Sequence, residues 1–363
     1  MKLNKLIILL VICVVISPLI MAETTSADGT NNRAQSGFIF LRLPVTARQV
    51  ALEDSALTGE DGAMSAFVNI SEIADLEGIS LGYSNQNYYE GLFQMNNFAL
   101  TAKVSERIGL AFSARSLTSQ EMEVRTMADP EGESGLTYRF KDMAIGLGFG
   151  YRITKRFSIG SKVKFVNESI RNTTATTFLI DIATTYRLNY KNMRIIANFE
   201  NFGPEGAFEG QQLWDTVDPT DDENSEDPVD NTDIPLDYML RTKEFPAPAK
   251  IAIGLKGDLV GENAFFTSRD NLLVMSTSVI KTKDQFENFN FGLEYKYTGM
   301  DNFELIGRVG TKQHREEDYD AEYAFGAGVK YMMSETSSIN LDYSYTNHEW
   351  LDQSHMMTIG FNF

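Results

Sequence analysis

The chain ends with His355-Met-Met-Thr-Ile-Gly-Phe-Asn-Phe363, and this stretch decides the fold. Met357, Ile359, Phe361 and Phe363 alternate with small or polar residues, which is the two-residue period of a β-strand with one apolar face. An apolar face on the last strand can be covered by lipid or by a second sheet. The stretch therefore leaves two alternatives, a membrane β-barrel and a water-soluble β-sandwich.

The same period recurs along residues 79–363. In Met143-Ala-Ile-Gly-Leu-Gly-Phe-Gly-Tyr151, large apolar residues share one face and glycine or alanine the other, a pattern that a helix would scatter around its axis. We predict fourteen strands, near 79–85, 95–104, 107–116, 137–152, 156–169, 177–189, 193–203, 247–257, 270–281, 286–298, 303–313, 321–332, 337–346 and 354–363.

The number of strands and the lengths of their connections favour the barrel. An even number of strands puts both ends of a barrel on one side of the membrane. Connections after even-numbered strands are mostly short, whereas those at 117–136 and 204–246 follow odd-numbered strands; only 258–269 breaks the rule. Short turns opposite long external loops are typical of transmembrane barrels. The predicted fold class is therefore all-β, a transmembrane antiparallel β-barrel of about 14 strands with an N-terminal plug.

The two ends of the chain agree with this fold. The terminal Phe363 and the alternating residues before it resemble the C-terminal aromatic signature of bacterial outer-membrane proteins, so we take these four residues as the barrel-assembly signal. Residues 1–22 have the short basic region, apolar core and final Ala22 of a secretory signal peptide. A membrane anchor is the alternative, although the apolar run is short for a span. Cys13, the only cysteine, lies in this run, which excludes disulfides and thiol catalysis from a cleaved chain.

The composition is compatible with a membrane barrel. Hydrophobic residues make up 43% and the mean hydropathy is −0.22, because polar residues facing a lumen dilute those facing lipid. The 24 Phe and 15 Tyr would supply aromatic girdles at the two membrane interfaces. A net charge of −18 argues against nucleic-acid binding.

The polar faces of the predicted strands carry charges of both signs. Charges on a lipid face are destabilising, so we expect these side chains to point into the lumen. They could form a charged conduit or a network that fills and braces the interior. The residues are Arg115, Lys162, Lys164, Asp181, Arg187, Glu294, Lys296, Arg308, Lys330 and Asp342.

Residues 37–78 lack the strand alternation. An apolar stretch is followed by a helix-like segment over 45–55, which Thr46 could cap, and by a turn at 58–62 that contains two glycines. We expect residues 23–36 to be flexible, 37–78 to form a plug in the lumen, and 79–363 to form the barrel.

The order of features resembles the PorV/PorQ family of outer-membrane barrels, which is similar in architecture to the FadL long-chain fatty-acid transporters. Sequences of that family begin with a Phe-Leu-x-Leu/Ile motif, which is followed by Ala-Arg, an acidic turn and Asn-Pro-Ala. The chain departs from it where Ile70 and Ser71 follow the Asn, and where Glu53 replaces a usual Gly. The corresponding residues, the plug motif, are Phe40, Leu41, Leu43, Ala47, Arg48, Asp61, Gly62 and Asn69.

Other candidate sites are weak. Residues 215–237 contain ten acidic residues and no basic one, but lack the spacing and the Gly of a calcium loop, so a solvated external loop is the main interpretation and a weak Ca²⁺ site the alternative. His314, His348 and His355 are the only histidines, and no nucleophile motif, metal-ligand spacing or phosphate loop accompanies them. We expect neither an enzyme nor a cofactor.

The resemblance implies two functions in the outer membrane of a Gram-negative bacterium. A PorV-like protein would bind secretion-machinery subunits and secreted proteins of a type IX-like system. A FadL-like protein would instead pass a hydrophobic small molecule through the plug and a lateral opening in the wall. Outer-membrane lipid is a partner in both cases. An open porin is the third alternative, and the plug argues against it.

Overall fold

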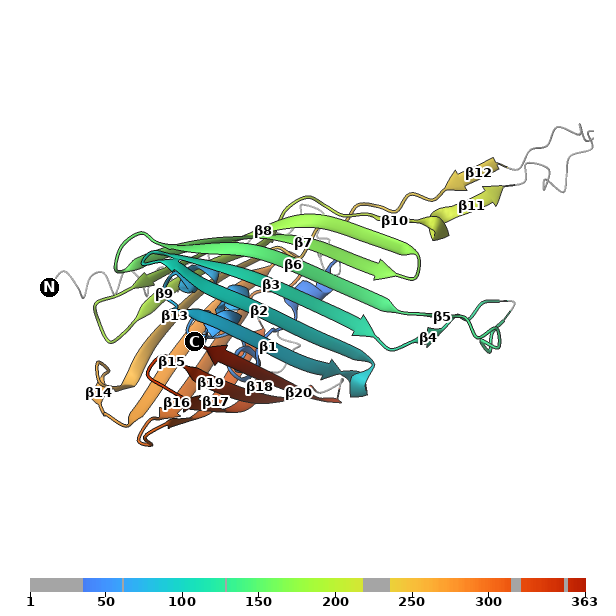
Figure 1. Ribbon diagram of the computed structural model, residues 1–363. Helices are drawn as coiled ribbons and strands as arrows, with labels where there is room; N and C mark the ends of the chain where they lie inside the picture. The colour runs from blue at the N-terminus through green and yellow to red at the C-terminus, as the bar shows by residue number, and fades with distance from the viewer. Residues whose placement is uncertain (1–34, 61, 128, 218–235, 315–320, 349–351) are drawn as a thin grey trace, which may run out of the picture.

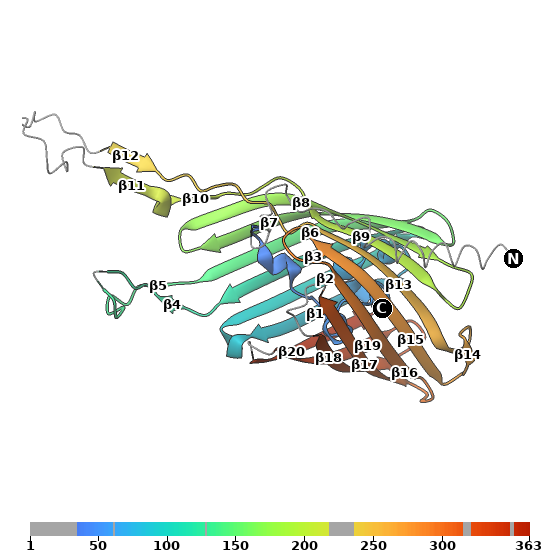
Figure 2. The ribbon, with the colours of Figure 1, turned by 180° about the vertical axis from the view of Figure 1, so that it is seen from behind.

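Fourteen antiparallel strands close into a barrel in the computed structural model, which describes residues 35–60, 62–127, 129–217, 236–314, 321–348 and 352–363. Each wall strand pairs with the next in chain order, and β20 returns to pair with β1 (Figures 1 and 2). The wall strands are β1 Ile79–Tyr88, β2 Phe93–Ser105, β3 Ile108–Ser119, β6 Phe140–Arg152, β7 Phe157–Ile170, β8 Thr173–Arg187, β9 Arg194–Phe202, β13 Lys250–Gly261, β15 Asn271–Thr282, β16 Asn288–Tyr297, β17 Phe303–His314, β18 Glu322–Met332, β19 Ser338–His348 and β20 Asp352–Asn362.

The predicted fold class and number of wall strands are confirmed, and the irregular connection at 258–269 has a structural cause. Strand β13 runs four residues further than predicted, to Gly261, and its pairing with β15 shifts register between Asp258 and Val260. Such a shift is a β-bulge, which bends the strand locally. The short strand β14, Phe266–Thr267, then pairs parallel to the end of β13.

The last strand lies where its sequence predicts. Ser80 of β1 is opposite Asn362 of β20, and the amide of Phe363 donates to the carbonyl of Ile79 at 2.9 Å. Met357 and Phe363 are 60% and 53% exposed on the outer face of the wall, whereas the alternating Thr358 is buried.

The outer and inner faces of the wall differ as a membrane barrel requires. Leu147 and Phe178 are 65% and 62% exposed, and they belong to a band of outward-facing apolar side chains. An exposed apolar surface of this extent is unfavourable in water and is typical of a surface that contacts lipid. Inward-facing neighbours such as Ala144 are buried. No helix among the described residues is long and apolar enough to cross a bilayer.

Longer connections lie at the end of the barrel opposite the C-terminus. Two hairpins project there, one formed by β4 and β5 and the other by β11 and β12 (Figures 1 and 2). The elements at this end are η4 Tyr89–Gly91, β4 Met122–Glu123, β5 Thr137–Tyr138, β10 Phe208–Gly210, η5 Gln211–Leu213, β11 Trp214–Val217 and β12 Leu236–Met239. Most connections at the other end are tight turns, as the sequence predicts.

The residues before β1 form short helices inside the barrel (Figure 1, blue). They are η1 Ile39–Arg42, α2 Ala47–Ala51, η2 Gly62–Met64, α3 Ser65–Val68 and η3 Ile70–Ala74. Thr46 caps α2 by accepting a hydrogen bond from the amide of Gln49, as predicted. The helix is shorter than the predicted 45–55, because Glu53 and Asp54 adopt positive φ angles and end it. We call residues 35–78 the plug segment.

Candidate functional site

The plug segment crosses the lumen and touches both halves of the wall. Helix α2 contacts β17–β20, whereas η3 contacts β3, β6, β7 and β8. Short helices leave many backbone carbonyls without partners, and such groups are destabilising where water is excluded. Side chains of the wall donate to several of them: Lys162 to Ala66, Asn198 to Val68, Arg152 to Ala74, Ser84 to Val45, and Arg115 to Leu41 and Leu43. The wall thus supplies the hydrogen bonds that the irregular plug backbone lacks.

Glycines on the inner face of the wall let the backbone of the plug approach. A Cβ on Gly160 would lie 2.6 Å from the carbonyl carbon of Ile70, and one on Gly109 would lie 2.1 Å from the carbonyl oxygen of Ile73. Across the lumen, a Cβ on Gly310 would lie 2.4 Å from the carbonyl carbon of Leu52. These distances are far below van der Waals contact, so the plug occupies the space that a side chain would fill.

The plug-motif residues lie at the contacts between plug and wall. Phe40, Leu41, Ala47 and Arg48 are buried, and Leu43 is half-buried. Gly62 has a φ of 65°, which favours glycine. The side chain of Asn69 accepts from the amide of Ser71 to cap η3 and donates to Thr185 of the wall at 2.9 Å. Asp61 lies outside the described residues.

A buried ion network joins α2 to the wall. The guanidinium of Arg48 meets Glu294 at 2.7 Å, Arg308 meets the same carboxylate at 2.7 Å, and Arg308 meets Asp342 at 2.5 Å. Glu60 of the plug lies 3.5 Å from Arg48, and burial raises its pKa above the usual range. Removing one partner from such a buried network is strongly destabilising, so the network fixes the position of α2.

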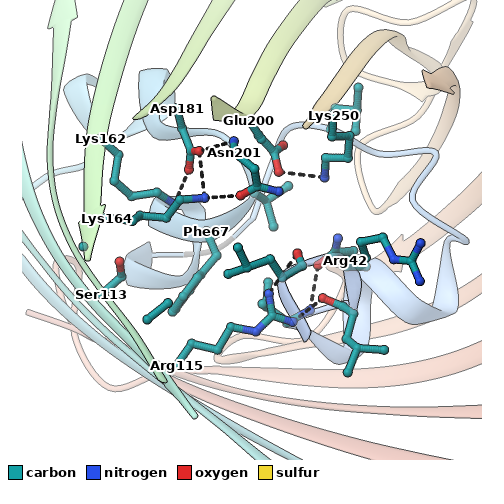
Figure 3. A pocket seen from close by; sticks show the side chains of 18 residues that line it. Arg42, Phe67, Ser113, Arg115, Lys162, Lys164, Asp181, Glu200, Asn201 and Lys250 are labelled. Carbon is teal, nitrogen blue, oxygen red and sulfur yellow. Dashed lines mark hydrogen bonds and ion pairs between the residues drawn. The ribbon is translucent and has the colours of Figure 1, made fainter. Parts of the chain in front are cut away.

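A second cluster of charges lies beside a small hollow (Figure 3). Asp181 accepts from Lys162 at 3.2 Å and from Lys164 at 2.7 Å, and Glu200 meets Lys250 at 2.7 Å. The hollow has a volume of about 40 Å³, which admits water molecules but not an organic ligand. These pairs lie between the plug and β7, β8, β9 and β13.

The remaining predicted lumen charges also lie on the inner face. Arg187 pairs with Asp75 of the plug, Lys296 lies 3.6 Å from Glu294, and Lys330 is half-buried on β18. Mutual pairing of this kind braces the plug against the wall. It is the arrangement that a structural network needs, whereas an ion conduit needs charges that face a continuous water path.

A larger cavity of about 540 Å³ lies above the plug, toward the end of the barrel that carries η4. Its floor is formed by plug residues, among them Leu43, Val50 and Glu53, and its rim includes Tyr89 and Gln285. An apolar cavity of about 150 Å³ can hold benzene, so this one has room for a larger molecule. We take it as the candidate binding site.

The lining of the cavity has apolar and polar sides. Phe93 and Leu117 from β2 and β3 are apolar, and Ile280 from β15, on a different part of the wall, is a further apolar lining residue. Polar side chains come from β16 to β20 and from β1: Asn288, Asn290, Lys312, Glu322, Thr346, Ser354 and Gln86. The sequence analysis missed this site. The polar positions of 286–298 indicated which residues face inward, but not which of them the plug leaves uncovered.

The histidines do not converge on one site in the described part of the chain. His314 lies 3.2 Å from Glu322, and His355 bonds to the hydroxyl of Tyr343 at 2.6 Å while exposed on the outer face. No cluster of three or more metal-binding side chains occurs among the residues that the structure describes. The signal peptide and most of the acidic stretch 215–237, including 218–235, lie outside the described residues.

Solved structures of two transporters are similar to this chain in fold. The chain is similar to the toluene transporter TodX of Pseudomonas putida, with a TM-score of 0.55 and 13% identity over 92% of this chain and 99% of TodX. It is also similar to the toluene transporter TbuX of Ralstonia pickettii, with a TM-score of 0.57 and 10% identity over 91% of this chain and 98% of TbuX.

At these identities the likeness concerns the fold. No protein-family model matches the chain, and no curated protein matches it in sequence. Both similar structures are named as toluene transporters. Nothing in them supports the PorV/PorQ family or type IX secretion specifically. The chain forms a closed antiparallel β-barrel of 14 strands that is similar in fold to these two transporters.

Proposed function

We propose that the protein takes up a small hydrophobic molecule across the outer membrane of a Gram-negative bacterium. The observation that carries the proposal is the cavity of about 540 Å³ between the plug and the mouth of the barrel. Concave sites with a largely apolar lining and a few placed polar groups are typical of small-molecule binding. The structural neighbours TodX and TbuX, named as toluene transporters, support the same class of ligand.

The plug makes a selective binding protein a better interpretation than an open pore. Its helices contact wall strands on both sides of the lumen, and its backbone is hydrogen-bonded to them. A ligand that binds above the plug would leave through a rearrangement of the plug or of the wall. The alternative function in secretion would need a surface that binds other proteins. The cavity lies inside the barrel and is not such a surface.

The proposal is tested by filling the cavity. Leu117, which is buried and lines it, is replaced by Trp; the matched control is Leu147→Trp on the lipid-facing surface, where Leu147 is 65% exposed. Binding of toluene to each protein in lipid nanodiscs is measured by saturation-transfer NMR against empty nanodiscs. We expect binding by the wild type and the control, and loss of binding by Leu117→Trp. Equal signals from both variants would refute the cavity as the site.

A further inference from the structure

Among the residues that line the cavity, two buried polar side chains lack hydrogen-bond partners, and the half-buried Asn288 has a buried amide oxygen that also lacks one within the described ranges. Asn290 of β16 is 2% exposed, and neither its amide nitrogen nor its amide oxygen bonds to any residue that the structure describes. Thr346 of β19 is 4% exposed, and its hydroxyl is likewise unpartnered within the described ranges. Both residues line the cavity. Buried polar groups are nearly always hydrogen-bonded, so an unpartnered pair facing one cavity points to a ligand or to water.

The two residues lie at similar heights on the polar side of the wall. Asn290 is opposite Lys312 in the β16–β17 pair, and Lys312 is opposite Glu322 in the β17–β18 pair. Two residues further along β18, Ala324 is opposite Thr346. The apolar surface formed by β2 and β3 faces them from another part of the wall. A molecule in the cavity would therefore meet hydrocarbon on one side and neutral hydrogen-bonding groups on the other.

The cations that line the cavity are already compensated. All three cationic lining residues have a carboxylate partner: Arg42 with Asp284 at 2.9 Å, Lys250 with Glu200 at 2.7 Å, and Lys312 with Glu322 at 3.1 Å. Burial raises the pKa of Glu53 to about 8, so this side chain is mostly uncharged at neutral pH. The lining therefore offers no unpaired cation to a carboxylate ligand, and a desolvated anion without a partner binds poorly.

We propose, building on the function proposed above, that the ligand is an uncharged hydrocarbon bearing a hydroxyl group, which bonds to Asn290. A hydroxyl both donates and accepts, so it can meet the amide oxygen and the amide nitrogen of this side chain, both of which are unpartnered among the described residues. Thr346 lies three strands away, about 14 Å along the wall, and is beyond the reach of the same hydroxyl. A bare hydrocarbon would displace water from these groups and leave them unpaired, which weakens binding. Sites built to bond a hydroxyl discriminate strongly against the analogue that lacks it.

The test uses three probes that share one benzene ring and differ in its single substituent, namely toluene, benzyl alcohol and benzoate. Their dissociation constants for the full chain in lipid nanodiscs at pH 7 are measured by calorimetry, with empty nanodiscs subtracted. Asn290→Leu removes the amide at similar volume, and Thr346→Val does the same for the hydroxyl. We expect Asn290→Leu to reduce the affinity for benzyl alcohol relative to toluene by about tenfold, since one lost hydrogen bond corresponds to roughly that factor. Thr346→Val, three strands away, should leave the ratio unchanged.

The control is Asn340→Leu. Asn340 is also buried on the inner face and its amide oxygen is also unpartnered among the described residues, but it does not line the cavity. This variant should leave the ratio of the two affinities unchanged. A ratio that stays within twofold in Asn290→Leu, or tighter binding of benzoate than of benzyl alcohol, overturns the assignment. Binding of none of the probes would overturn the proposed function as well, whereas binding of toluene with an unchanged ratio would leave that function standing.

Discussion

Replacing Gly160 by Val should displace the plug without unfolding the barrel. A Cβ at this position would lie 2.6 Å from the carbonyl carbon and oxygen of Ile70, whereas ordinary contacts begin at 3.4 Å. Both atoms of Ile70 belong to the backbone and cannot rotate away as a side chain would. Helix η3 would therefore have to move away from β7 by about 0.8 Å, the difference between 3.4 and 2.6 Å. The hydrogen bonds of Asn69 and Ser71 to Thr185, both 2.9 Å long, would then stretch beyond bonding distance.

The free-energy change follows from these losses. Overpacking of this kind is destabilising by about 1–3 kcal/mol, and each of the two lost hydrogen bonds adds about 1 kcal/mol. The sum, about 3–5 kcal/mol, falls on the contact between plug and wall. The wall keeps its continuous backbone ladder, because Val is favourable in a strand. The plug should therefore detach while the barrel stays closed.

The assay combines conductance with gel mobility. Wild-type protein in a planar bilayer should conduct ions poorly, and Gly160→Val should conduct clearly more, while both keep different mobilities before and after boiling. The matched control is Gly307→Val in β17, where a Cβ would meet no atom within 4 Å. If Gly160→Val conducts no better than this control, the close approach of η3 to β7 does not hold the plug, and the reasoning fails.

Three further predictions concern other parts of the molecule. Deletion of residues 37–75 should give large, steady conductance, because these residues occupy the lumen; a deletion variant that conducts like the wild type would contradict occlusion by the plug. Phe363→Asp should block insertion into the outer membrane while leaving export intact, since a charge would replace an aromatic side chain that is 53% exposed on the outer face; wild-type surface levels, measured by surface biotinylation, would argue against this. Glu53→Gln should weaken the pH dependence of plug stability. The folded pKa of Glu53, about 8, exceeds the ordinary 4.5, so its contribution to stability falls as pH rises between these values, by at most about 5 kcal/mol. Proteolysis of the wild-type plug should be faster at pH 9 than at pH 5, and this difference should be smaller in the variant, which keeps Glu60, whose pKa burial also raises; an equal difference in both proteins would contradict the assignment to Glu53.

The sequence predicted the wall well because each wall strand carries its own signal. Alternation within 143–151 identifies β6 without reference to any other part of the chain, and the observed strand, Phe140–Arg152, lies within the predicted 137–152. The ends of the strands were harder to predict, as at β13, where a bulge depends on the neighbouring β15. The absence of alternation in 37–78 separated this segment from the wall by the same local criterion.

The candidate site could not be predicted in this way. Asn290 and Thr346 lie on different strands, and whether an inward side chain meets the plug or an empty space depends on the path of the plug. The glycines at 148 and 150 were visible as small residues on one face, but their close approach to η3 could be seen only in the structure. The buried ion pairs likewise join plug and wall residues that are up to 246 positions apart.

The pairing of β1 with β20 also constrains the order of assembly. It brings together Ser80 and Asn362, about 280 positions apart, and contacts of such sequence separation are entropically unfavourable until the intervening chain is ordered. The plug segment leads directly into β1, accepts a hydrogen bond from Lys162 of β7 and donates one to Thr358 of β20, on the other side of the lumen. Once β1 has paired with β20, the wall has no gap between neighbouring strands through which the plug could enter from the side. A plug that enters afterwards would have to pass through one end of the closed barrel. Biogenesis is therefore most direct if the plug folds against the open sheet, as a template around which the wall curls, and closure comes last.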